Sequence, residues 1–282
     1  MIRLILNADD LGLTPALSEA VVALRSDGAI TDVSFLSVGA AFEEGVALMK
    51  IAEIKTAGVH LCLVGSETPV CSAAKIPSLV AGGRFRDSWP AVALAAVSGR
   101  IKGVEVEREW EAQIARVQAA GLRVTHLDGH QHLHLLPSLL PIAIRLAKRF
   151  GISTIRAPRA DDPAAGGGGI SRIARLRAGI LARFGHAARM KLRAAGLPEP
   201  PRVLGLAEAG RMTSERWAVL LAALPDDGDF EVALHPGAVD EAARARYRWG
   251  YCWGEESAAL RSPELRTAFA GKGIQLISFN QL

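Results

Sequence analysis

Short aliphatic runs alternate with longer amphipathic segments along almost the whole chain, and this alternation constrains the fold more than any other feature. The runs are short enough to be buried strands, and they lie at residues 3–8, 32–38, 57–63, 123–128, 153–158, 202–207, 230–235 and 274–279. Helical patterns lie between them, at residues 14–27, 40–52, 105–120, 137–150, 213–223 and 262–271. Such an alternation is typical of a mostly parallel sheet covered by helices.

Eight strands with helices between them favour an α/β fold of the (β/α) barrel type, a TIM-like barrel that is distorted or incomplete. A doubly wound open sheet is the alternative, but no glycine-rich phosphate loop follows the first strand, where a dinucleotide-binding fingerprint would lie. Residues 64–104 and 159–201, the latter with a GGGG run at 166–169, break the rhythm and are interpreted as insertions. We therefore expect residues 1–282 to form one domain.

Composition and cysteine content limit the functions and the cellular settings that we expect. Half of the 282 residues are hydrophobic, which allows a sizeable core, and the net charge of only +4 gives little support to nucleic-acid binding. Cys62, Cys71 and Cys252 cannot all pair within one chain, so we expect a reducing, cytoplasmic setting. We expect no secretory signal, because the first apolar run, residues 2–8, is short and ends in acids. We expect no spanning helix, because no stretch reaches the roughly 18 apolar residues that one needs.

Two neighbouring carboxylates, Asp9 and Asp10, end the first aliphatic run. Like charges side by side at a buried strand end repel each other and resist desolvation. Polar side chains also follow three other strands: His60, Asp128 with His130, and His235. Because the carboxyl ends of parallel strands form the functional face of such folds, we expect these residues to converge. One strand histidine alone would be an ordinary core residue; agreement among several strand ends favours a shared site.

Four of the seven histidines lie in one short stretch, HLDGHQHLH at residues 126–134. If this stretch is extended, alternation puts five polar side chains on one face: His126, Asp128, His130, His132 and His134. Gly129 is expected to interrupt strict extension, so the shared face is a tendency. A metal ion or a hydrogen-bonded network would satisfy these groups in a buried strand; a solvated polar loop is the alternative.

Imidazoles together with one carboxylate are a usual ligand set for a divalent cation. One of the paired aspartates can bind the cation, whose charge then allows the other to stay ionised nearby. Water bound to such a cation becomes acidic enough to attack near neutral pH, and the free carboxylate can take its proton. The residues therefore indicate hydrolase chemistry.

The motifs NADDLGL, GVHLCL, THLDGHQHLH and ALHPG resemble those of the YdjC-like carbohydrate deacetylases. This group includes chitooligosaccharide deacetylases and deacetylases associated with hopanoid biosynthesis. The resemblance extends to SPELRTAFAGKGIQLISF near the C-terminal end, and so covers nearly the whole chain. It implies a (β/α)-barrel-like fold and a divalent cation held by an Asp–His–His triad. Leu11 stands where many relatives have phenylalanine, a change that leaves the metal chemistry untouched.

Matched position by position, the resemblance implies that Asp10, His60 and His130 bind the cation and that Asp9 is the general base. His235 is our candidate for the general acid. Five further residues are expected to contact the substrate or to support the ligands: Asp128, His132, His134, Arg156 and Trp253. We expect the cation to be Zn²⁺ or Mg²⁺, with Mn²⁺, Co²⁺ and Ni²⁺ as alternatives.

The resemblance implies hydrolysis of an N-acetyl group on an amino sugar, carried by an oligosaccharide or a glycolipid. A metal-dependent phosphoesterase on a similar barrel is one alternative, although such sites often have a His-x-His on the first strand, which here offers only aspartates. A catalytically silent sugar- or lipid-binding relative is another. Such a protein would be expected to lack Asp9 or a metal ligand, and none is missing.

Two further segments are informative. Residues 170–196 hold seven basic side chains among Ile, Leu and Ala and predict a basic amphipathic helix. Such a helix lies peripherally on an anionic membrane or an acidic partner, or is an ordinary surface helix whose arginines cover apolar neighbours. Trp249, Tyr251 and Trp253 either stack on sugar rings, if extended, or plug a loop. The oligomeric state stays open, a homodimer included.

Overall fold

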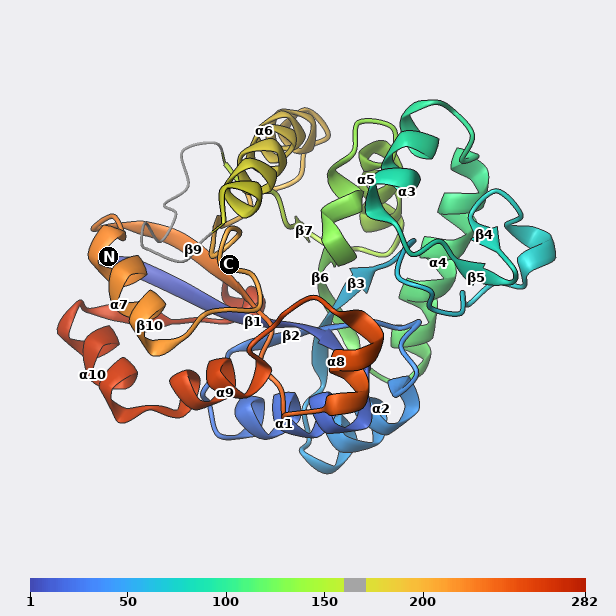
Figure 1. Cartoon of the computed structure of the whole chain (residues 1–282). Coiled ribbons are helices and arrows are strands. Elements are labelled where there is room, and N and C mark those ends of the chain that lie inside the picture. The colour runs from blue at the N-terminus through green and yellow to red at the C-terminus, as the bar shows by residue number, and fades with distance from the viewer. Residues whose placement is uncertain (160–170) are drawn as a thin grey trace.

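The computed structural model describes residues 1–159 and 171–282. Its centre is one parallel sheet that curls into an incomplete barrel, with helices outside it (Figure 1). Neighbouring strands follow the order β7 (Thr154–Ile155), β6 (Arg123–Gly129), β3 (Thr56–Leu61), β2 (Asp32–Phe35), β1 (Ile2–Leu11), β9 (Gly228–Leu234) and β8 (Arg202–Leu204). The predicted fold class is confirmed.

All eight predicted strands form, but the last of them does not take the place it would have in a regular barrel. β9 pairs with β1 along residues 2–8, so no strand separates them. β10 (Ile274–Leu276) pairs with residues 2–4 of β1 on its other edge, ahead of β2. Within the described residues, β7 and β8 end the row of strands, and the barrel stays open between them.

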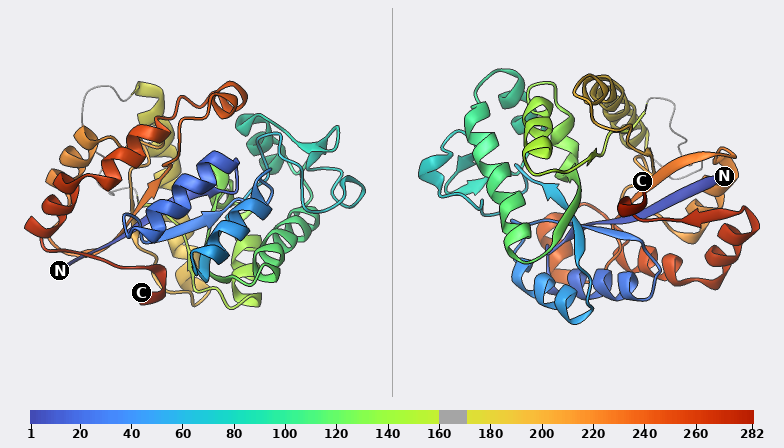
Figure 2. Two further views of the ribbon diagram at one scale, coloured as in Figure 1. Left: turned by 90° about the horizontal axis from the view of Figure 1, so that it is seen from below. Right: turned by 180° about the vertical axis from the view of Figure 1, so that it is seen from behind.

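The six predicted helices are also present: α1 (Pro15–Ser26), α2 (Phe42–Ile51), α4 (Gly103–Ala119), α5 (Leu140–Arg149), α7 (Ser214–Ala223) and α10 (Pro263–Gly271). Each buries one apolar face. In α4 this face repeats every three or four residues through Val106, Trp110, Ile114 and Val117. Figure 2 shows from below and from behind that the helices lie around the strands, which leaves the strand ends to form a site.

The two stretches that break the rhythm contain further elements. Residues 64–104 form a 3₁₀ turn, η1 (Ala73–Lys75), a small hairpin of β4 (Val80–Ala81) with β5 (Arg84–Phe85), and α3 (Trp89–Val97). In residues 159–201 the basic segment forms α6 (Arg172–Ala194), as predicted, whereas the GGGG run lies outside the described residues. The interpretation of both stretches as insertions stays a prediction.

Outside these two stretches, four more short elements of the described residues are new relative to the sequence analysis: η2 (His130–Leu135), α8 (Glu241–Tyr247), α9 (Trp253–Arg261) and η3 (Phe279–Gln281). The first three of them border the site described below. Across the described parts of the chain, none of the helices combines the length and the apolar character needed to cross a bilayer.

Asp32, the first residue of β2, is 4% exposed, and its carboxylate accepts a hydrogen bond from the Phe279 N–H at 3.3 Å. Burial raises its pKa to about 7, against the effects of Thr31, Arg25 and Phe279. Because the folded carboxyl holds its proton to a higher pH than the unfolded one, ionisation of Asp32 removes stability as the pH rises from about 4 to 7.

We therefore predict that Asp32→Asn gains stability relative to the unmodified protein as the pH rises, by up to about 1.4 kcal/mol per pH unit between pH 5 and 7. Urea unfolding at pH 5, 6, 7 and 8 measures the difference between the two proteins. A difference that stays constant over this range would contradict the prediction.

Candidate metal centre and active site

β1 continues through both aspartates to Leu11 and so carries them to the mouth of the barrel. Asp9 and Asp10 are 3% and 7% exposed. Side chains of a regular strand alternate between faces, but the β1–β2 register shifts between Ala8 and Leu11, and Asp10 has a φ of 63°. Aspartate tolerates this left-handed conformation better than most residues. The irregularity lets both carboxylates serve one site.

Asp10, His60 and His130 come together, as the sequence predicts. Oδ1 of Asp10 lies 3.0 Å from Nδ1 of His130 and 3.5 Å from Nε2 of His60. All three side chains are buried, and one candidate ligand atom of each lies within 4.8 Å of the other two. The geometry thus matches a three-residue cation site at the ends of β1, β3 and β6. Their role as metal ligands stays a prediction.

His60 is oriented by a second carboxylate. Its Nδ1 lies 2.8 Å from Oδ1 of Asp128, which is fully buried. This contact leaves Nε2 directed towards Asp10. A carboxylate behind a metal-binding histidine fixes the ring and its tautomer in many metalloproteins. Asp128 therefore lies where a residue that supports a ligand is expected.

The fully buried guanidinium of Arg156 binds three carboxylates at once. It donates to both oxygens of Asp9, at 2.6 and 2.7 Å. It also contacts Oδ2 of Asp128 at 2.9 Å, and its Nε donates to Oε1 of Glu231 at 2.7 Å. Asp9, His60 and Asp128 form a second group close enough to hold a cation. Because Arg156 already occupies the carboxylates of that group, we assign the cation to the first one.

Buried negative charge exceeds buried positive charge here. Burial works against a charged His60, but Asp128, Asp9 and Asp10 outweigh it and raise the His60 pKa to about 9. Burial also acts to raise the Asp10 pKa, yet His130 and His60 hold it well below its usual range. The carboxylates therefore favour an additional positive charge beside them, and a divalent cation between Asp10, His60 and His130 would supply it.

The histidine-rich stretch is not extended throughout. β6 ends at Gly129, and residues 130–135 form η2, in which Gln131 and His132 have left-handed φ angles of 52° and 56°. The expected shared face is therefore wrong beyond Gly129. His130 still reaches Asp10, but Nε2 of His134 lies 2.9 Å from the carbonyl oxygen of Arg156 and so supports the backbone of that residue.

His126, two residues before Asp128 in β6, belongs to the core under the site. Its ring stacks on Phe279 with centroids 3.6 Å apart, and its Nε2 lies 2.9 Å from Oγ of Ser34. Burial lowers its pKa to about 4, so the neutral ring is the stable form. Ser34 also donates to Oδ2 of Asp128 at 2.7 Å. His126 therefore supports Asp128 through Ser34 and does not face the cation site.

His235 faces Asp9 from the end of β9. Its Nε2 lies 4.0 Å from Oδ2 of Asp9. Its backbone N–H donates to the buried carboxylate of Glu256 at 2.7 Å, which fixes the turn after β9. Burial lowers the pKa of His235, so the imidazole is neutral at pH 7. The structure thus puts a neutral imidazole beside a carboxylate that Arg156 holds in place.

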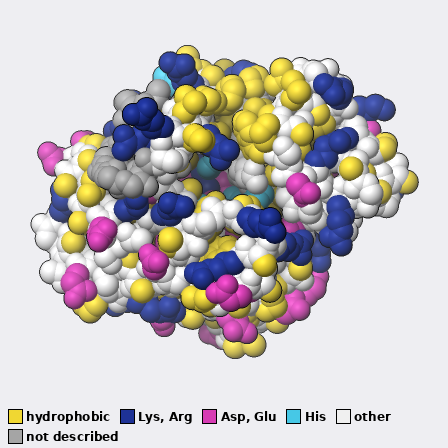
Figure 3. Space-filling view, in the orientation of Figure 1, with side chains coloured by type: hydrophobic (Ala, Val, Ile, Leu, Met, Phe, Trp, Pro, Cys, Tyr) yellow, Lys and Arg dark blue, Asp and Glu magenta, His cyan; other side chains and the backbone are white. Residues whose placement is uncertain are grey.

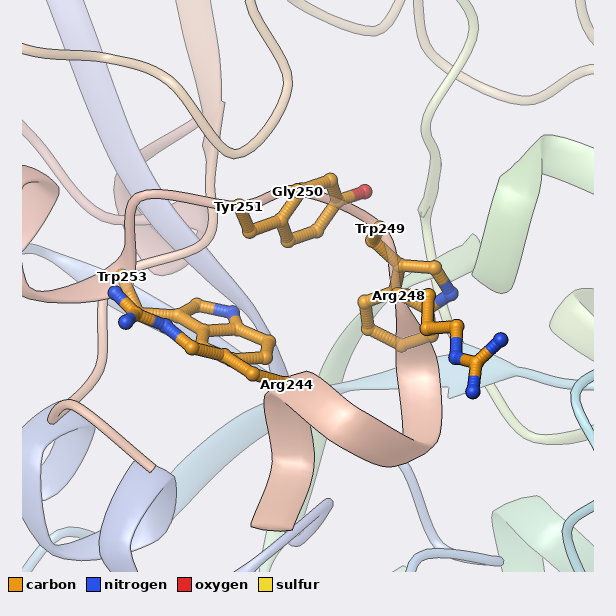
Figure 4. Close-up of a pocket in the computed structure, with 6 residues that line it drawn as sticks. All are labelled: Arg244, Arg248, Trp249, Gly250, Tyr251 and Trp253. Carbon is orange, nitrogen blue, oxygen red and sulfur yellow. The ribbon is translucent and has the colours of Figure 1, made fainter. Parts of the chain in front are cut away.

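Aromatic rings from the segment between α8 and α9 adjoin the histidines. The Trp249 ring centroid lies 5.3 Å from that of His130, and the Tyr251 centroid lies 4.8 Å from that of His235. These rings line a pocket of about 340 Å³ (Figure 4). Trp253, a predicted site residue, also lines it, but this residue begins α9, so the segment is not extended through Trp253. Figure 3 shows histidine side chains inside a hollow of the same face.

With the geometry established, comparison with known proteins identifies the family. A model described as YdjC-like protein matches residues 3–271. The chain belongs to the YdjC-like family. A carbohydrate deacetylase from Brevibacillus brevis is 27% identical over 281 residues, which cover 99% of each chain. A chitooligosaccharide deacetylase from Klebsiella pneumoniae is 28% identical over 284 residues, covering 99% of this chain and 98% of that protein.

A solved structure supports the fold. The crystal structure of an Enterococcus faecalis protein named for cellobiose-phosphate cleavage matches with a TM-score of 0.77, covering 99% of this chain and 98% of that one. The sequences are 24% identical. The incomplete barrel of this YdjC-like protein is therefore shared with a solved relative.

Four polar residues of the YdjC-like site were not singled out from the sequence: Asn7, Ser34, Glu231 and Glu256. Asn7 donates to Oδ1 of Asp9 at 2.8 Å, and Glu231 accepts from Arg156. Asn7, Ser34 and Glu231 stand inside predicted aliphatic strands, where a buried polar residue needs a partner. For these three residues the sequence therefore contained a signal, namely a polar residue within an aliphatic run. Glu256 lies in a helix that was not predicted, and no such signal marked it.

We predict that Arg156→Met lowers the free energy of unfolding by about 3–5 kcal/mol, because it leaves Asp9, Asp128 and Glu231 buried without their counter-charge. Arg149→Met is the control. Arg149 is half exposed and pairs with Glu107 and Glu111 at 3.3 and 2.9 Å, so its loss is expected to cost less than about 1 kcal/mol. Urea unfolding measures both variants, and equal losses would contradict the account.

Proposed function

We propose that this YdjC-like protein is a metal-dependent hydrolase that removes the N-acetyl group from an amino sugar, carried by an oligosaccharide or a glycolipid. The convergence of Asp10, His60 and His130 beside a second carboxylate, that of Asp9, which Arg156 holds in place, carries the proposal. The relatives named carbohydrate deacetylase and chitooligosaccharide deacetylase, which align over nearly the whole chain, support it.

The donor set fits a divalent cation. Two imidazoles and one carboxylate suit Zn²⁺ and also accept Mg²⁺, Mn²⁺, Co²⁺ or Ni²⁺, and the surplus of buried carboxylates favours any of them. A cation held by Asp10, His60 and His130 would supply Lewis-acid activation of the acetyl carbonyl and of the attacking water. We propose Zn²⁺ or Mg²⁺ as the natural ion.

The proton transfers of the reaction give roles to Asp9 and His235. Asp9 accepts a proton as the water oxygen adds to the carbonyl carbon. Because His235 is neutral at rest, it must gain a proton before it can act as an acid, and Oδ2 of Asp9 lies 4.0 Å from its Nε2. The proton passes from Asp9 to His235 and then to the nitrogen as the C–N bond breaks, which yields acetate and a free amine.

The pocket beside the cation site fits a sugar. Trp249 and Tyr251 lie next to His130 and His235 and line the pocket, and aromatic rings pack against the apolar faces of pyranose rings. A sugar stacked there would hold its N-acetyl group near Asp9 and Asp10. We propose that the rings form a platform for the sugar, which is one of the two interpretations that the sequence allowed.

Asp9→Asn is predicted to keep its metal and to lose turnover by about 10²–10⁴-fold, because a general base typically contributes that much. His60→Ala and His130→Ala are predicted to lose the metal as well as activity. Acetate release from N-acetylglucosamine oligomers and glycolipids, with and without chelator, measures activity, and elemental analysis measures bound metal. His186→Ala is the control, because this histidine is exposed on α6.

Four results would contradict the proposed function or one of the residue roles in it. Near-normal turnover of Asp9→Asn would show that Asp9 is not the general base. Full metal content in His60→Ala would show that His60 is not a metal ligand. Release of phosphate from sugar phosphates, without release of acetate from any acetylated sugar, would favour the phosphoesterase alternative. Near-normal turnover of His235→Ala would move the acid to another histidine.

A further inference from the structure

The first half of α6 exposes apolar side chains that no other described element covers. Ile173, Leu176 and Ile180 are 64%, 66% and 41% exposed. Their spacing of three and four residues puts them on one stripe of the helix. The buried residues of α6 belong to its second half, from Ala182 to Leu192. The helix is thus anchored at one end and presents an apolar stripe to the outside at the other.

Charge on α6 has one sign. Its 23 residues include no acidic side chain. Arg189 and Arg193 pair with Glu199, and Arg189 also donates to backbone carbonyls, so these two serve the fold. The exposed Arg172, Arg177 and Arg183 accompany the apolar stripe. An apolar stripe flanked by arginines is the pattern of helices that lie in the interface of an anionic bilayer.

A second exposed apolar pair lies on α3, whose Leu94 and Val97 are 60% and 70% exposed. Both α3 and α6 adjoin η2, which carries His130: Nε1 of Trp89 in α3 donates to the carbonyl of Gln131 at 2.9 Å, and α6 packs on η2. Both helices lie on the same side of the molecule in the front and back views (Figures 1 and 2). Hydrophobic side chains gather there, above the hollow that contains histidines (Figure 3).

We propose that these five residues, here called the apolar rim (Leu94, Val97, Ile173, Leu176 and Ile180), together with the α6 arginines form a docking surface for a bilayer that contains anionic lipid. The apolar rim inserts among the lipids, and the arginines bind their headgroups. Docking in this way holds the mouth of the site at the membrane, within reach of a sugar that a lipid carries. Membrane binding by this surface does not require the deacetylation reaction, so vesicle binding tests it independently of the proposed function.

The test is co-sedimentation of the whole protein with vesicles of phosphatidylcholine alone or of phosphatidylcholine with phosphatidylglycerol. We expect binding to the anionic vesicles only, and loss of binding at high salt. The triple variant R172Q/R177Q/R183Q is expected to bind at least about tenfold more weakly, because it removes three positive charges that bind the anionic headgroups. Leu176→Glu tests the apolar rim independently and is also expected to weaken binding. If one of the two variants misfolds, the other still tests the proposal.

Matched controls lie away from this surface. K50Q/R266Q/K272Q removes the same charge from exposed positions on α2 and near α10, and Ile51→Glu changes an 81% exposed apolar residue of α2. Both are expected to bind within about twofold of the unmodified protein. Absence of binding to anionic vesicles, or equal losses in α6 and control variants, would overturn the proposal. A dimer that Leu176→Glu dissociates, without vesicle binding, would instead make the surface a contact between two copies.

Discussion

The ion pair network of Arg156 is the interaction on which the site depends. One guanidinium, buried in the barrel, holds Asp9 at the end of β1, Asp128 at the end of β6 and Glu231 in β9. Without it, these three carboxyl groups would be buried together with no counter-charge from Arg156. Because Asp128 in turn orients His60, the network also sets the geometry of the proposed cation site. Fold stability and catalytic geometry thus rest on the same contacts.

The network leaves negative charge uncompensated, and this surplus explains why two neighbouring aspartates end β1. Arg156 binds Asp9, whereas Asp10 contacts the imidazoles of His60 and His130. A divalent cation there would balance Asp10 and leave Asp9 free to move protons. The two carboxylates therefore take different roles because their partners differ: one has a guanidinium and the other has imidazoles. The irregular backbone at Asp10 makes this division possible.

Much of this arrangement could be predicted, because the position of each strand along the chain and the polar residues at its end are visible in the local sequence. The aliphatic runs gave every strand of the barrel, and polar residues at their carboxyl ends gave Asp9, Asp10 and His60. What failed depends on contacts between distant segments. The left-handed turn after Gly129 directs His134 to the backbone of Arg156, which no periodicity indicates. The pairing of β10 with the start of β1 likewise joins the two ends of the chain and could not be predicted from local sequence.

The central claim is that one divalent cation binds between the ends of β1, β3 and β6. A crystal structure of the metal-loaded protein, with anomalous scattering recorded at the metal edge, tests it most directly. The account predicts a single peak about 2.0–2.2 Å from an oxygen of Asp10 and from ring nitrogens of His60 and His130, with Asp9 still bound to Arg156. A peak at Asp9 and Asp128, or no peak at saturating metal, would contradict it.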